Sequence, residues 1–215
     1  TRQTKLGADS LDVAESQESL GGLAFAMGNY AAADPYFVKA LSIRRAKLGP
    51  EDPAVAESLF DLGQLQRRRG AYPAAEGSLV QALSIREKKL SPADPRIGES
   101  LTELAALYQD LGDYRAAEPP LLRALALQER ALGNDHPDVA ESLTRLAALS
   151  TAAGKLGDAE SLLMRALAIR EKKLGPNHPS VADSACDLND LAMRRGDLAR
   201  ADEQYGRALA IRRAT

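Results

Sequence analysis

Apolar residues recur along this chain at the spacing of an α-helix. Leu101, Leu104, Ala105 and Tyr108 stand at positions i, i+3, i+4 and i+7, which form one face of a helix. A second apolar run between residues 117 and 128 follows the same rule after a short polar gap. The pattern therefore predicts two helices joined by a tight turn.

This helical pair is one copy of a repeat with a period of 42 residues. The segment Val-Ala-Glu-Ser at 55–58 returns in similar form at 13–16, 97–100, 139–142 and 181–184, with no insertion between copies. Single positions keep the same spacing, among them a column of leucines and a column of alanines. These two columns are Leu20, Leu62, Leu104, Leu146 and Leu188, and Ala33, Ala75, Ala117, Ala159 and Ala201.

Five units account for all but five of the 215 residues. We place the repeats at about 9–50, 51–92, 93–134, 135–176 and 177–215, within a single repeat domain over residues 1–215. One helical pair cannot bury both of its faces, so neighbouring pairs must stack. The sequence therefore predicts an all-α superhelix, or α-solenoid, of about ten antiparallel helices. Residues 1–7 align with the tail of a second helix and resemble the end of a preceding helix.

Glycine and proline mark the turns of each unit. A glycine column (Gly28, Gly70, Gly112, Gly154 and Gly196) separates the two helical runs, where a left-handed residue has to end the first helix. Asp52-Pro53 and Asp94-Pro95 place a capping acid ahead of a proline that suits the first turn of the next helix. His136 and His178 precede a proline in the same way and are predicted to be exposed capping residues.

Composition and charge narrow the classes of function. The 39 Ala and 33 Leu are strong helix formers, whereas only nine residues are aromatic and none is Trp. The net charge is −2 and no basic stripe crosses the repeats, which argues against a nucleic-acid or membrane-surface partner. The single Cys cannot form an internal disulfide framework. We see no targeting or membrane-spanning segment and expect a cytoplasmic protein.

The sequence contains no recognisable catalytic motif. No phosphate-binding glycine loop, paired-His metal motif or nucleophile elbow occurs, and the two His residues lie 42 positions apart. We therefore expect no enzyme activity, catalytic residues, cofactor or metal.

The repeat resembles the tetratricopeptide repeat. In the third unit the residues that carry the resemblance are Leu104-Ala105, Tyr108, Gly112, Tyr114, Ala117, Leu121 and Ala124. A lengthened second helix at 124–132 and the loop at 132–140 resemble the kinesin-light-chain subtype. In this family the first helices line the concave face, which implies a partner-binding groove in this chain. Its predicted members are Glu18, Phe25, Phe60, Gln64, Arg67, Thr102, Gln109, Thr144, Cys186 and Asp190.

One departure from that subtype concerns peptide binding. Kinesin light chains carry an Asn pair that clamps a cargo peptide, but the matching positions of this chain hold no Asn, as in Glu18-Ser19 and Phe60-Asp61. The Lys and Asn set of the chaperone-tail carboxylate clamp is also missing. Phe25 and Phe60 remain as apolar groove residues. They either anchor a partner or fill a void beside small residues such as Gly21, Gly22 and Gly63.

These features predict a non-enzymatic scaffold that binds a protein or peptide partner. A more specific hypothesis is a bacterial kinesin-light-chain-like protein associated with a tubulin-like filament, and the Ala, Arg and Leu content fits a bacterial origin. The alternative is a regulatory repeat array cut from a larger signalling or protease-linked protein. Self-association through the end repeats is also expected, because no distinct polar helix closes either end.

Overall fold

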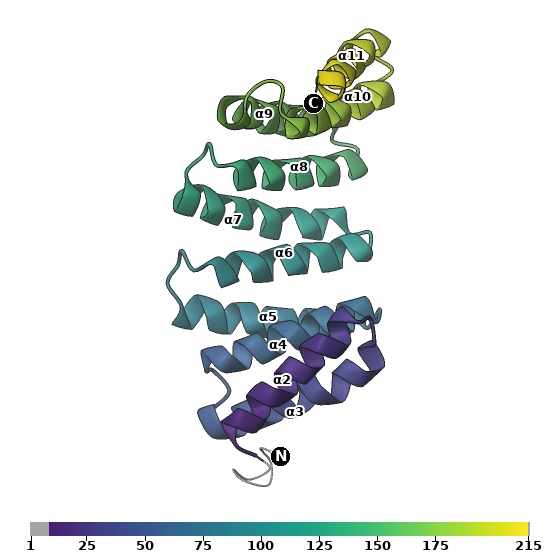
Figure 1. The fold of residues 1–215 in the computed structure, drawn as a ribbon. Coiled ribbons are helices and arrows are strands. Elements are labelled where there is room, and N and C mark those ends of the chain that lie inside the picture. Colours follow the sequence, from purple (N-terminus) through teal and green to yellow (C-terminus); the bar gives the residue numbers. More distant parts are fainter. Residues whose placement is uncertain (1–8, 215) are drawn as a thin grey trace. The chain divides into compact units, whose positions relative to one another are not determined.

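A computed structural model describes residues 9–214, and the expectation for residues 1–7 lies outside this range. Within it the chain forms ten α-helices and no strand (Figure 1). The first five are α2 (Leu11–Ala26), α3 (Tyr30–Leu48), α4 (Pro53–Arg68), α5 (Tyr72–Lys89) and α6 (Pro95–Asp110). The others are α7 (Tyr114–Leu132), α8 (Pro137–Ala152), α9 (Leu156–Leu174), α10 (Pro179–Arg195) and α11 (Leu198–Ala214).

The helices fall into two compact units, Thr1–Leu111 and Gly112–Thr215. The first unit contains α2 to α6 and the second contains α7 to α11. In each unit every helix packs against the next one along the chain, and α4 also contacts α2 and α6. This sequential stacking of helix pairs is that of an α-solenoid and confirms the predicted all-α fold.

The first helices begin at the predicted caps. Asp52 Oδ1 accepts a hydrogen bond from the backbone N–H of Ala54 at 2.8 Å, at the start of α4. His136 Nδ1 accepts from Asp138 N at 3.2 Å at the start of α8. His178 caps α10 in the same way, and its Nδ1 lies 3.1 Å from Ser180 N. Both His residues are therefore capping groups, as the sequence predicts, but they are half-buried and not exposed.

The glycine column supplies the turn between the two helices of a pair. Gly28, Gly70, Gly112, Gly154 and Gly196 have φ values between 73° and 77°, in the left-handed region. A side chain in this conformation costs about 1–2 kcal/mol, so glycine is the favoured residue. The predicted left-handed ends of the first helices are confirmed.

Two glycines on the first helices have a different role, which is close packing. A Cβ atom on Gly21 would lie 2.7 Å from the ring of Phe37, and one on Gly63 would lie 2.7 Å from Leu79 Cγ. Phe37 and Leu79 belong to the second helices α3 and α5 and are buried. The atoms closest to Gly21 and Gly63 therefore belong to these two side chains.

Candidate partner-binding face

The ten predicted groove residues all lie on first helices. Seven are in the first unit, where α4 has α2 and α6 as neighbours, and three are in the second unit. They are Glu18 and Phe25 on α2, Phe60, Gln64 and Arg67 on α4, Thr102 and Gln109 on α6, Thr144 on α8, and Cys186 and Asp190 on α10. Asp190 is exposed and the other nine are half-buried.

Glu18 is tied into a contact among three helices. Its carboxylate accepts two hydrogen bonds from the guanidinium of Arg44 on α3, one of them with an Nη2–Oε2 distance of 2.6 Å. Arg44 is buried and also donates to Ser58 Oγ on α4 at 2.8 Å. A bidentate, half-buried pair of this kind is stronger than an exposed ion pair. Glu18 therefore holds α2, α3 and α4 together.

The bond to serine recurs in other repeats, and sequence reasoning missed it. In each case a long polar side chain on a second helix donates to, or accepts from, a serine 14 positions later, on the next first helix. The pairs are Arg44–Ser58, Arg86–Ser100, Gln128–Ser142 and Arg170–Ser184. The sequence does contain a signal for these bonds, because an Arg or Gln and a Ser recur at these two positions every 42 residues.

Phe60 and Phe25 both pack within the first unit. The Arg86 guanidinium carbon lies 4.4 Å from the centre of the Phe60 ring, a distance typical of a cation–π contact. The Phe25 ring lies 5.4 Å from the ring of Tyr30, centre to centre. Each phenylalanine also touches the apolar core of this unit. Both rings thus contribute to packing while part of each remains accessible to a partner.

Asp61 is the most strongly perturbed acid on this face. Burial and the nearby charge of Glu18 raise the pKa of its carboxyl group to about 7. The positive charges of Arg44 and Arg86 act in the opposite direction but do not offset the burial. Asp61 follows Phe60 in the pair of positions that resembles the Asn pair of kinesin light chains. This position therefore changes its charge near neutral pH.

Arg67 is a bridge between α4 and α6. Its Nε donates to Glu103 at 2.6 Å and its Nη1 donates to Asp110 at 2.7 Å. The Arg67 side chain is only 11% exposed. Its positive charge is therefore balanced within the protein, which leaves little of it for an anionic partner.

Among the remaining polar groove residues, Thr102, Thr144 and Asp190 make hydrogen bonds within their own helix. Thr102 and Thr144 donate their hydroxyls to backbone carbonyls one turn earlier, at 2.9 and 3.0 Å. Cys186 packs against a buried apolar cluster of the second unit, and Asp190 accepts a hydrogen bond from Asn189 at 3.2 Å. The first unit thus holds the densest set of interactions on the predicted face.

The part of the chain that the structure describes contains neither a metal-binding cluster nor a membrane-spanning helix. Nowhere between residues 9 and 214 do three or more His, Cys, Asp or Glu side chains come together as a metal site requires. Over the same residues, every helix is too short or too polar to cross a membrane.

The structure consists of helix pairs, and a left-handed glycine joins the two helices of each pair. A comparison with models of known sequence families shows which family has this repeat. A model described as the tetratricopeptide repeat matches residues 12–88, 96–172 and 140–214. The chain belongs to the tetratricopeptide repeat family. Proteins of this fold are in general interaction scaffolds and not enzymes. A search of curated protein sequences finds no match.

Solved structures identify the type of tetratricopeptide repeat. The chain resembles the nearly identical repeats assigned to a kinesin light chain of Podosopora anserina, with 27% identity, a TM-score of 0.84, and coverage of 94% of this chain and 96% of that one. BtubC (BKLC) from P. vanneervenii gives 23% identity and a TM-score of 0.78 over 95% and 81% of the two chains. The tetratricopeptide repeats of this protein are therefore kinesin-light-chain-like.

A third structure shows the same fold in another setting. The Rap protein complexed with competence and sporulation factor shares 20% identity with this chain and has a TM-score of 0.61. The match covers 91% of this chain and 52% of the Rap protein. At this identity the likeness concerns the fold alone.

Proposed function

We propose that this protein is a non-enzymatic scaffold that binds a protein or peptide partner on the face formed by its first helices. One observation carries the proposal. The positions of this face differ from repeat to repeat, as in Glu18, Phe60 and Thr102, whereas the packing columns next to them are almost constant. Membership of the tetratricopeptide repeat family supports the same function.

The first unit is the part of this face that we assign to the partner. Phe25 and Phe60 are half-buried aromatic side chains on the adjacent helices α2 and α4. Aromatic residues with a fixed orientation are efficient anchors because they bury a large area at little cost in side-chain entropy. The Arg86 guanidinium fixes one of these rings. The partner is expected to place an apolar side chain against them.

The test uses a peptide selected from a random library against the wild-type protein. Phe60→Ala is expected to weaken binding of this peptide at least tenfold, whereas the control Val80→Ala leaves it unchanged. Val80 is an exposed apolar residue on the second helix of the same repeat. Equal binding by wild type and Phe60→Ala, together with a loss in Val80→Ala, would place the site on the second helices and overturn the proposal.

The finer proposal is a cytoplasmic, bacterial protein that associates with a tubulin-like filament. Its support is the kinesin-light-chain-like repeat. The alternative is a regulatory repeat array from a larger signalling or protease-linked protein. Co-sedimentation with preformed bacterial tubulin filaments separates the two, because only the first predicts that the protein enters the pellet.

Self-association through the end repeats belongs to the same proposal. Leu20 and Leu23 on α2 are exposed, although Leu62 and Leu65 at the equivalent positions of α4 are buried against α3. A second copy is the expected occupant, because its α11 exposes Tyr205 on a second helix. Light scattering should show a mass that rises with concentration and stays monomeric in Leu23→Glu. A monomer at every concentration of the wild type would contradict this part.

A further inference from the structure

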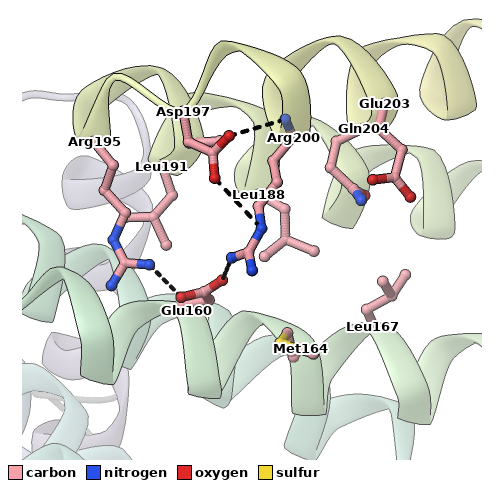
Figure 2. A pocket seen from close by; sticks show the side chains of 11 residues that line it. Glu160, Met164, Leu167, Leu188, Leu191, Arg195, Asp197, Arg200, Glu203 and Gln204 are labelled. Carbon is pink, nitrogen blue, oxygen red and sulfur yellow. Dashed lines mark hydrogen bonds and ion pairs between the residues drawn. The ribbon is translucent and has the colours of Figure 1, made fainter.

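A pocket of about 220 Å³ opens in the second unit, among α9, α10 and α11 (Figure 2). Met164 and Leu167 of α9 and Leu188 and Leu191 of α10 form its apolar wall. None of the ten predicted groove residues lines it. The pocket is therefore separate from the face proposed above and calls for its own explanation.

One position of the repeat that lines the pocket holds a small residue. Ala192 lines it and is equivalent to Gln66 and Tyr108 in the second and third repeats. There the longer side chains reach a neighbouring second helix. Gln66 accepts a hydrogen bond from Ser78 at 2.8 Å, and the Tyr108 hydroxyl donates to Glu76 Oε1 at 2.7 Å. An alanine reaches neither partner, so the corresponding space stays open.

The partners in these two bonds have counterparts in the pocket. Glu160 is equivalent to Glu76, and Gln204 is equivalent to Ser78. Gln204 Oε1 is fully buried, and no hydrogen-bond donor of the described residues reaches it. A buried acceptor without a donor costs about 1–3 kcal/mol, which a ligand with a suitable donor would recover.

Glu160 is held in a fixed position at the edge of the pocket. Its carboxylate accepts hydrogen bonds from Arg195 of α10 and, at 2.7 Å, from Arg200 of α11. Arg200 is itself paired with Asp197 at 3.4 Å (Figure 2). The Glu160 side chain remains 26% exposed and so can accept a further bond. The pocket thus combines an apolar wall with two oriented acceptors.

We infer that this pocket binds the phenol side chain of a tyrosine from a partner polypeptide. The third repeat is the internal precedent, since there a tyrosine of the chain itself occupies this place and donates to the equivalent glutamate. The volume is sufficient, because a cavity of about 150 Å³ accommodates benzene. The ring would lie over Ala192, next to the Met164 sulfur, which favours aromatic contacts. The hydroxyl would donate to Glu160 or Gln204.

The test compares p-cresol, which reproduces the tyrosine side chain, with toluene, which reproduces phenylalanine. Methyl signals of Met164 and Leu188 in NMR spectra of the full chain report occupancy. We expect saturable shifts with p-cresol and an affinity about fivefold above that of toluene, because one neutral hydrogen bond contributes about 1 kcal/mol. Equal affinities, or no saturable shift with p-cresol, would overturn the assignment.

Two variants locate the site. Ala192→Tyr restores the residue of the third repeat and is expected to abolish p-cresol binding, whereas Ala148→Tyr on the exposed surface of α8 leaves it intact. Gln204→Leu removes the orphan acceptor but leaves Glu160, and it is expected to lower the affinity for p-cresol while the affinity for toluene does not fall. Retained p-cresol binding in Ala192→Tyr would show that the ligand occupies another place.

A last comparison distinguishes a polypeptide partner from a free phenolic metabolite. N-acetyltyrosinamide carries the backbone amides of a peptide and should bind as well as p-cresol, because the pocket is open to solvent above Met164, a residue that is 58% exposed. N-acetylphenylalaninamide should bind more weakly. Binding of p-cresol without binding of N-acetyltyrosinamide would contradict a polypeptide ligand.

Discussion

Arg44 in the first unit and Arg212 in the second occupy the same position of the repeat, yet only Arg44 is enclosed by other helices. The Arg44 side chain is 10% exposed and holds Glu18 and Ser58, whereas the Arg212 side chain is 57% exposed and meets Asp183 at 3.2 Å. The difference arises because Arg44 lies between α2 and α4 while Arg212 lies on α11. The same residue type thus contributes to stability only where neighbouring helices remove it from water.

A second contrast between the units concerns the space between a first helix and the second helices next to it. Tyr108 fills this space in the first unit, whereas Ala192 leaves it open in the second. The helical backbone follows the same 42-residue plan in both places, and the side chain at this position is one difference between the filled space and the pocket. The repeat therefore supplies the frame, and local exchanges on that frame create binding surfaces.

Among the variants that test the contrast between Arg44 and Arg212, Arg44→Ala is expected to cause the largest loss of stability. The change leaves Glu18 half-buried with only a long hydrogen bond from Ser58 Oγ at 3.5 Å, and loss of one member of a charged pair costs about 3–5 kcal/mol when the pair is fully buried. Because Glu18 is partly solvated, we expect a loss of about 2–4 kcal/mol in the free energy of unfolding. Urea unfolding followed by circular dichroism measures it.

Arg212→Ala is the matched control, and an exposed ion pair contributes about 0–1 kcal/mol. The contrast between the units fails if both alanine variants lose the same free energy.

An intermediate effect is expected from Asp61→Asn, and it depends on pH. The pKa of Asp61 is about 7 in the folded protein against 3.8 for an ordinary Asp, so the folded state binds the proton more tightly. Wild-type stability from this group is therefore complete below about pH 4 and is lost as the pH rises to about 7. Asn removes this loss. We expect Asp61→Asn to be more stable than wild type at about pH 8 by about 1–3 kcal/mol, since one pKa unit corresponds to about 1.4 kcal/mol.

Asp187 is the equivalent residue of the second unit, and burial raises its pKa as well. Asp187→Asn should give the same sign with a smaller gain. The charge that acts most on the pKa of Asp187 is that of Arg170, which opposes the rise, whereas at Asp61 it is that of Glu18, which adds to it. Thermal melts at about pH 4.5, 6 and 8 measure both variants. A gain that is equal at all three pH values would show that protonation of Asp61 does not control it.

Sequence reasoning succeeded where the decisive contacts are local. The caps at Asp52 and His136 and the left-handed Gly70 depend on residues within one turn, so their spacing along the chain was enough. Phe60 shows the limit, because its partner Arg86 lies on another helix and the relevant distance is set by how the two helices pack. The pocket was hidden for a similar reason. Ala192 differs visibly from Gln66 and Tyr108, but an alanine opens a cavity only when its neighbours do not close over it.

The smallest change in stability is expected from Gly→Ala substitutions, which distinguish glycines in close contact with another helix from glycines with free space around them. Gly63→Ala places a Cβ atom 2.7 Å from Leu79 Cγ, and Leu79 is fully buried, so the second helix has to shift. Overpacking of this kind typically costs about 1–3 kcal/mol, and we expect the lower end because Ala147 at the equivalent position of α8 packs in a buried cluster with Leu163.

Gly77→Ala is the control within the same repeat. Nothing lies within 4 Å of the added atom, and alanine in a helix interior is favoured over glycine by about 0.5–1 kcal/mol. The two alanine variants should therefore change the melting temperature in opposite directions. If Gly63→Ala also raises it, α4 and α5 can move apart without cost, and close packing at Gly63 would no longer explain why α4 has glycine where α6 and α8 have Ala105 and Ala147.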